Sequence, residues 1–90
     1  MAEKRPLPVF ARRLREAREA CGISQRTLGI KIGLDEFVAS ARINRYETGV
    51  HQPALPIQQL LANALGRPLA YFYAESDELA RMIARFGSKR

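Results

Sequence analysis

The sequence has few of the residues that build most enzyme and metal sites. Its 90 residues include one cysteine, Cys21, and one histidine, His51. One cysteine cannot form an internal disulfide, which suits the reducing cytoplasm. One histidine with no second ligand at suitable spacing predicts no metal site. A glycine-rich phosphate loop and a nucleophile–base pair are also missing, so we expect neither an enzyme nor a cofactor-binding protein.

Long apolar runs are absent as well. No stretch approaches the roughly 18 apolar residues that a membrane helix needs. The first ten residues, MAEKRPLPVF, contain no hydrophobic signal core. We therefore expect a cytoplasmic protein with no membrane partner. With 47% hydrophobic and 27% charged residues, the chain has the composition of one ordinary globular domain.

Acidic residues are outnumbered by basic ones, mainly in the first half of the chain. Fifteen Lys and Arg face nine Asp and Glu, which gives a net charge of +6. Residues 1–45 contain ten basic and five acidic side chains, whereas residues 46–90 contain five and four. A concentrated basic excess favours a polyanionic partner, because phosphates attract such a surface and release counterions on binding. A merely solvated surface would have the same charge, so charge alone leaves the partner open.

The spacing of apolar residues predicts an all-α fold without strands or repeats. Helix starts and stops divide the chain at intervals of ordinary helix length. The starts are Pro8, Ser24, Pro56, Pro68 and Ser76, and the stops are Gly22, Gly33, Gly49 and Gly66. Serine is a natural N-cap, proline fits a first helical turn, and glycine commonly follows a last turn.

The helix before Gly49 can be phased from its inner residues. If Ile43, Tyr46 and Glu47 face inward, about 100° per residue places Ala41 and Arg45 on the outer face. Arg42 and Asn44 flank these two positions. This face is polar and basic, which makes it the candidate binding surface of the helix.

Extended backwards, the same helix would turn Glu36 inward and Phe37 outward, which reverses the usual preference. We therefore expect the helix to cover Ser40–Thr48, with Ser40 as its N-cap. Residues 34–39 are then an enlarged turn, either extended or with one helical turn of its own, in which Phe37 and Val38 pack against the domain.

Three stretches, taken in order, resemble one known family. They are ISQRTLGIKIGL at 23–34, ARINRYETG at 41–49 and LLANALG at 60–66. Together they are similar to the lambda-repressor/Cro-like, or xenobiotic-response-element, family of bacterial helix-turn-helix regulators. The resemblance implies a compact five-helix DNA-binding domain with the helix-turn-helix at helices two and three, plus a short C-terminal helix. Fourteen positions separate Gly33 from Glu47, about four more than in the usual motif.

The resemblance also implies domain limits. A flexible N-terminal arm would cover 1–8, the helix-turn-helix domain 9–74, and the C-terminal helix 75–90. Lys4 and Arg5 in the arm would contact the DNA backbone or remain an ordinary disordered terminus.

The resemblance assigns roles to the outer side chains. Base contacts are expected from Ser40, Ala41, Arg42, Asn44 and Arg45. Arg45 can form a bidentate pair with guanine in the major groove. Phosphate contacts are expected from Gln25, Arg26, His51 and Gln52, with Gln25 fixing the docking register.

Two structural roles follow from the same resemblance. Arg18 and Glu47 are expected to form a partly buried salt bridge between helices one and three. Gly29, where the family often has alanine, is expected to let helices two and three approach closely. Glu47 is thus assigned to structure and not to catalysis.

The expected partner is double-stranded DNA with a palindromic operator, bound by a homodimeric repressor. No small-molecule effector is evident. The dimerisation candidate is an apolar stripe in the terminal helix: Leu79, Met82, Ile83 and Phe86, joined by Tyr71 and Phe72. The same stripe could instead cover the core of the monomer.

Two other functions stay open at this point. An antitoxin-type interaction module would neutralise a protein partner and autoregulate through the same fold. RNA binding is less consistent with the sequence, because aromatic platforms for stacking single-stranded bases are missing.

Overall fold

The computed structural model describes residues 6–87. They form six helices: α1 (Val9–Ala20), α2 (Gln25–Lys31), α3 (Glu36–Glu47), α4 (Leu55–Leu65), the 3-10 helix η1 (Leu69–Tyr73) and α5 (Asp77–Gly87). No strand occurs within this part of the chain, so the all-α expectation is confirmed. Lys4 and Arg5 of the expected arm, and residues 88–90, lie outside the described residues.

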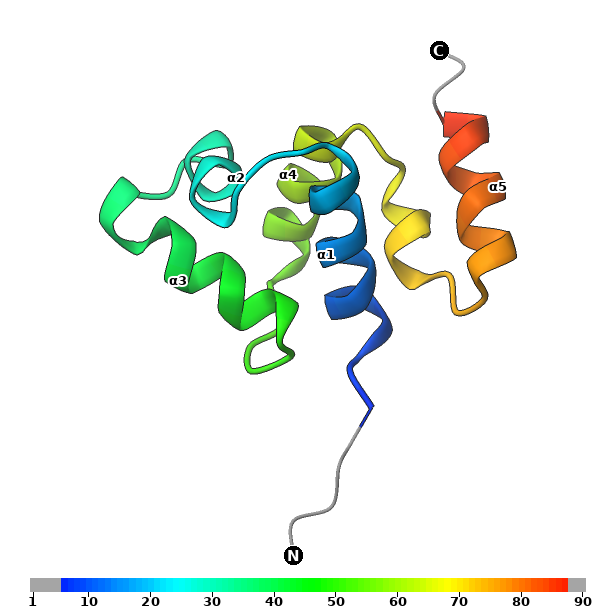
Figure 1. Cartoon of the computed structure of the whole chain (residues 1–90), viewed down its shortest axis with the longest axis horizontal. Helices are drawn as coiled ribbons and strands as arrows, with labels where there is room; N and C mark the ends of the chain where they lie inside the picture. The colour runs from blue at the N-terminus through cyan, green and yellow to red at the C-terminus, as the bar shows by residue number, and fades with distance from the viewer. Residues whose placement is uncertain (1–5, 88–90) are drawn as a thin grey trace, which may run out of the picture.

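Helix α1 lies at the centre of the molecule (Figure 1). Helices α2 and α3 lie on one side of it, and η1 and α5 on the other. The core fills the space between these helices with apolar side chains that are almost completely buried. They include Phe10, Leu14, Leu28, Ile43, Leu61 and Phe72.

Two of the expected caps are present. The Ser24 hydroxyl accepts a hydrogen bond from the Thr27 amide at 3.0 Å and starts α2. The Ser76 hydroxyl accepts one from the Leu79 amide at 3.0 Å, before α5. These bonds satisfy amides that have no partner inside the helix, so polar residues in the sequence marked both starts correctly.

The expected start of the third helix is wrong. Helix α3 begins at Glu36 and not at Ser40, and Asp35 is its N-cap, with Oδ1 accepting from the Phe37 amide at 2.8 Å. Residues 36–39 form a helical turn, as one of the two expectations for this segment allowed, but this turn is continuous with α3 and not separate from it. Aspartate is as good an N-cap as serine, and it comes first along the chain.

The side chains of that extra turn also point in directions that were not expected. Phe37 is 89% exposed and Val38 is 45% exposed, so neither packs against the domain as predicted. Ala39 takes the inward position and is completely buried. Glu36 lies on the surface and pairs with Arg26 at 3.2 Å. The inward position needs a small residue, and this requirement outweighs the usual preference for burying phenylalanine.

The reason for that requirement is Gly29. A Cβ atom added at Gly29 would lie 2.5 Å from the Ala39 Cβ and 2.9 Å from the Ala39 Cα. Two carbon atoms that are not bonded cannot approach so closely, so α2 and α3 lie this near to each other at Ala39 only because Gly29 has no side chain. The expected close approach at Gly29 is confirmed.

The C-terminal helix has two apolar sides. Ile83 packs partly against the core, whereas Leu79, Met82 and Phe86 are exposed. Tyr71 and Phe72, which were expected to join the stripe as a dimerisation surface, instead cover the core of the monomer, as the alternative expectation had it. Both are buried, and the Phe72 ring lies 5.3 Å from the ring of Phe10.

Between Pro6 and Gly87, no helix is both long and apolar enough to cross a membrane. The same stretch brings no group of three His, Cys, Asp or Glu side chains together as metal ligands.

Candidate nucleic-acid interface

Helix α3 divides its residues between two faces. Ala39, Ile43, Tyr46 and Glu47 are buried against the rest of the domain. Each of the expected base-contacting side chains is exposed: Ser40, Ala41, Arg42, Asn44 and Arg45. The phase inferred from Ile43, Tyr46 and Glu47 is therefore confirmed, although the helix starts earlier.

An ion pair fixes α3 to α1. Arg18 donates from Nε to Oε2 of Glu47 at 2.6 Å, and from Nη2 to Oε1 at 3.1 Å. Its remaining nitrogen, Nη1, donates to the Ile23 carbonyl at 2.9 Å. The hydrogen bond to Glu47 raises the pKa of the Arg18 guanidinium above its ordinary value. The expected salt bridge is confirmed, and Glu47 is 3% exposed.

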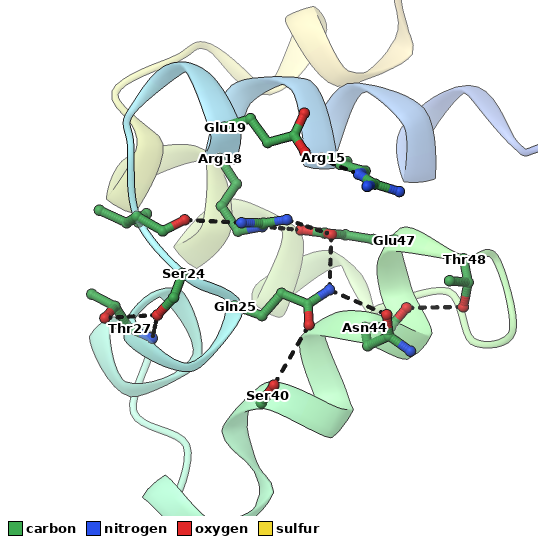
Figure 2. A network of polar contacts seen from close by, with 11 residues as sticks. Arg15, Arg18, Glu19, Ser24, Gln25, Thr27, Ser40, Asn44, Glu47 and Thr48 are labelled. Carbon is green, nitrogen blue, oxygen red and sulfur yellow. Dashed lines mark hydrogen bonds and ion pairs between the residues drawn. The ribbon is translucent and has the colours of Figure 1, made fainter.

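Gln25 extends this ion pair to the exposed face (Figure 2). Its Nε2 atom donates to Glu47 Oε1 at 3.0 Å and to Asn44 Oδ1 at 3.2 Å. Its Oε1 atom accepts from the Ser40 hydroxyl at 3.5 Å. Both amide hydrogens of Gln25 are thus used inside the protein. A carboxylate can only accept, so Glu47 determines which way the Gln25 amide points.

Asn44 is oriented by the same chain of contacts. Since Gln25 donates to Oδ1 of Asn44, the Asn44 nitrogen is directed away from Gln25 (Figure 2). The Thr48 hydroxyl donates to the backbone carbonyl of Asn44 at 2.9 Å, which closes the last turn of the helix. Asn44 therefore presents a hydrogen-bond donor to the exterior.

A polar hollow of about 450 Å³ opens beside these residues. It is lined by Arg15, Arg18, Ser24, Gln25, Arg26, Ser40 and Asn44. The hollow brings two expected phosphate contacts, Gln25 and Arg26, together with two expected base contacts, Ser40 and Asn44. A hollow rimmed by guanidinium groups and amides suits an anion such as a phosphate.

Arg15 is the residue at this hollow that the sequence reasoning missed. It lies on α1, three positions before Arg18, which places both arginines on neighbouring parts of one helix face. Arg15 pairs with Glu19 at 3.2 Å and is largely exposed. The spacing from Arg18 was the signal that could have identified it.

His51 and Gln52 lie elsewhere. They follow α3, where the amides of Val50 and His51 both donate to the Arg45 carbonyl, at 3.0 and 3.2 Å. Both side chains are exposed and border a small recess with Pro8 and Phe10. The four expected phosphate contacts therefore fall into two groups, one at the hollow and one beyond the C-terminal end of α3.

The comparisons with known proteins agree with this fold. Residues 9–71 match the model of a helix-turn-helix domain family. The crystal structure of the transcriptional regulator BswR is similar to the chain, with 44% sequence identity and a TM-score of 0.84. The match covers 89% of this chain and 79% of that one. No curated protein matches the chain.

Proposed function

Because the chain belongs to the helix-turn-helix domain family, we propose that it is a DNA-binding transcriptional repressor that inserts α3 into the major groove. The observation that carries this proposal is the division of α3 into a buried face and an exposed polar face. The exposed side chains are free to meet base edges, while Glu47 and Ile43 hold the helix in place. The family and the regulator-like neighbour favour this function over an enzymatic one. Repression is the action that we propose, because a bound domain can block access to the DNA that it covers.

Base reading is assigned to the exposed face. Arg45 pairs with guanine through O6 and N7, and Arg42 reads a second base or holds a phosphate. Asn44 offers its Nδ2 donor to a purine N7 or to guanine O6, because its oxygen is already used by Gln25. Ala41 meets a thymine methyl group, and the Ser40 hydroxyl contacts the DNA beside it.

Backbone binding is assigned to the polar hollow. Arg15 and Arg26 supply the positive charge that attracts a phosphate, and Gln25 supplies an amide. Gln25 would have to release Asn44 or Glu47 to donate to that phosphate, since both of its hydrogens are used. His51 and Gln52 would contact a second phosphate beyond the end of α3.

We further propose that two copies bind a palindromic operator. The exposed stripe of α5, consisting of Leu79, Met82 and Phe86, provides an apolar surface for a second copy. The half-sites would then lie about one helical turn, roughly 34 Å, apart. Light scattering tests this assembly: the protein should have the mass of a dimer, and Met82→Glu should have that of a monomer. A monomeric wild-type protein that still selects a palindrome would contradict this interface, and an antitoxin-type partner would then be the better occupant of the stripe.

A binding selection on random duplexes tests the central proposal. We expect one palindromic site, with affinity that falls steeply as salt rises because bound phosphates release counterions. Recovery of no preferred sequence, together with a shallow dependence on salt, would refute DNA reading by this chain.

Variants distinguish base contacts from phosphate contacts. Arg45→Ala should relax the preference at one base pair per half-site, at a cost of about 1–3 kcal/mol in discrimination. Arg15→Ala should weaken binding to all DNA sequences alike. It should also reduce the steepness of log affinity against log salt by about one. Arg81→Ala removes an exposed arginine on α5 and is the control for lost charge. It should leave the base preference and the salt dependence unchanged, apart from a small decrease in affinity for all sequences.

A further inference from the structure

Phe37 lies at the start of α3 with almost nothing covering it. It is 89% exposed, the largest value among the large apolar side chains of residues 6–87. The Asp35 cap and the burial of Ala39 fix the first turn, and this turn directs Phe37 outward. An aromatic ring in such a position contributes nothing to the core, which leaves it available for contact with a partner outside the monomer.

The phase of the helix places Phe37 on the proposed reading face. At about 100° per residue, Phe37 lies within roughly 20° of Asn44 and roughly 40° of Ala41 around the helix axis. It points away from Ile43 and Tyr46, which are buried. Phe37 therefore extends the row of exposed side chains by one turn towards the N-terminal end of α3.

The surroundings of Phe37 favour DNA over a protein partner. A stable protein interface buries about 800 Å² on each side and needs an apolar centre. The residues next to Phe37 on this face are Ser40, Ala41, Asn44 and Arg45, which are polar, small or basic. The nearby acidic groups are already engaged, because Glu36 pairs with Arg26 and Asp35 caps the helix. A duplex can approach this end of α3 without meeting an unpaired carboxylate from Glu36.

We propose that Phe37 reads the C5-methyl group of a thymine in the major groove. This inference rests on the proposed insertion of α3 into that groove. Phe37 and Ser40 are about 4.5 Å apart along the helix axis, and base pairs are about 3.4 Å apart. With α3 lying along the groove, the thymine would be about one base-pair step outside the bases that Ser40 and Ala41 meet. The additional helical turn of this chain thus lengthens the sequence that one half-site specifies.

The test removes one methyl group from the DNA and the ring from the protein. Each thymine of the selected operator is replaced in turn by deoxyuridine, which pairs identically but lacks the methyl group. For the wild-type protein, replacing one outer thymine by deoxyuridine should lower the affinity for the operator about fourfold. This is the factor that one buried methyl group contributes. With Phe37→Ala, the thymine and uracil operators should bind equally at that position. Leu60→Ala is the control, because Leu60 is an exposed apolar side chain on α4, outside the surfaces assigned to DNA and to the second copy, and should keep the full thymine-to-uracil ratio.

The outcomes separate this inference from the function on which it rests. If the protein selects an operator but Phe37→Ala keeps every thymine-to-uracil ratio, Phe37 does not read DNA and the inference is wrong. If no operator is selected at all, the proposed function itself fails. Phe37→Ala should unfold at the same temperature as the wild-type protein, because the side chain has no partner in the core to lose. The inference is supported if Phe37→Ala abolishes the thymine-to-uracil difference in affinity at one position only and leaves the unfolding temperature unchanged.

Discussion

Arg18 and Arg13 lie five residues apart on α1 and connect it to opposite parts of the molecule. Arg18 joins α1 to α3, where both partners are protected from water: the side chains of Arg18 and Glu47 are 12% and 2% exposed. Arg13 joins α1 to the start of α5, and here the arginine is 2% exposed but its partner Asp77 is 69% exposed. The chemistry of the two pairs is the same, and the difference lies in the access of water to the carboxylate.

Arg13 also differs from Arg18 in how many backbone groups it serves. Its Nε donates to the Ala74 carbonyl at 2.8 Å and its Nη2 to the Glu75 carbonyl at 3.2 Å. Burial lowers the pKa of Arg13, but hydrogen bonds and charges from Glu16 and Asp77 outweigh this effect and raise it above its ordinary value. The connection to α5 is thus built on carbonyls and keeps most of its contacts without Asp77. The connection to α3 depends on one carboxylate.

The largest effect is expected at Glu47. Glu47→Ala should lower the free energy of unfolding by about 3–5 kcal/mol, because it leaves Arg18 with an unpaired charge in a nearly dry site. It also removes the acceptor that orients Gln25. Urea unfolding measures the loss. Glu19→Ala, which breaks the exposed pair with Arg15, is the control and should cost less than about 0.5 kcal/mol. A cost for Glu47→Ala as small as that of the control would show that burial of the Arg18–Glu47 pair does not raise the cost of breaking it.

The second-largest effect is expected for Arg13→Ala, which should lower the free energy of unfolding by about 2–3 kcal/mol. The Ala74 and Glu75 carbonyls lose a charged donor, while Asp77 stays solvated. The loss should also be local. Amide hydrogen exchange should accelerate in α5 and η1 and stay slow in α2 and α3. Arg12→Ala is the control, because Arg12 also contacts Asp77 and Glu75 but is only half-buried. Equal acceleration in α3 would contradict the separation of the two sides.

Gly29→Ala tests the packing between α2 and α3 without touching any charge. The added methyl group would meet Ala39, so we expect a cost of about 1–3 kcal/mol from overpacking. The change should also displace α3 and lower DNA affinity. Ala39→Gly removes the atom that clashes but weakens the helix by about 1 kcal/mol.

The double variant Gly29→Ala, Ala39→Gly completes this cycle. It should be more stable than the sum of the two single costs predicts, because the clash exists only when both methyl groups are present. Strict additivity would mean that Gly29 does not set the distance between the helices.

The sequence predicted what local rules decide. Short-range preferences predicted the helix caps at Ser24 and Ser76, and the structure confirms them. They also predicted which side of the third helix faces inward, with Ile43, Tyr46 and Glu47 buried. The start of α3 was missed because two rules conflicted there. Asp35 favours a helix start, whereas the outward position of Phe37 argued against one, and the spacing of α2 from α3 decided the outcome.

Other features depend on residues that are far apart in the chain. The burial of Arg13 requires carbonyls 61 and 62 positions away, and no helix pattern distinguishes it from the exposed arginines around it. The hollow at Arg15 likewise arises only when α1, α2 and α3 meet. Contacts of this kind become visible only in the folded chain.

The smallest effect is expected from protonation of Asp77. The hydrogen bond from Arg13 lowers the pKa of Asp77 below its ordinary value of 3.8. Its contribution to stability should therefore be complete above that value and be lost as the pH falls through the lowered pKa of the folded protein. We expect the difference in unfolding temperature between the wild-type protein and Asp77→Asn to be constant from pH 7 to about pH 5 and to shrink below about pH 4. Thermal unfolding of both proteins across this range measures it, and the other carboxylates cancel because both proteins share them. A difference that stays constant down to the lowest pH would show that the Asp77 charge does not help to hold α5, and that the backbone carbonyls bound by Arg13 suffice.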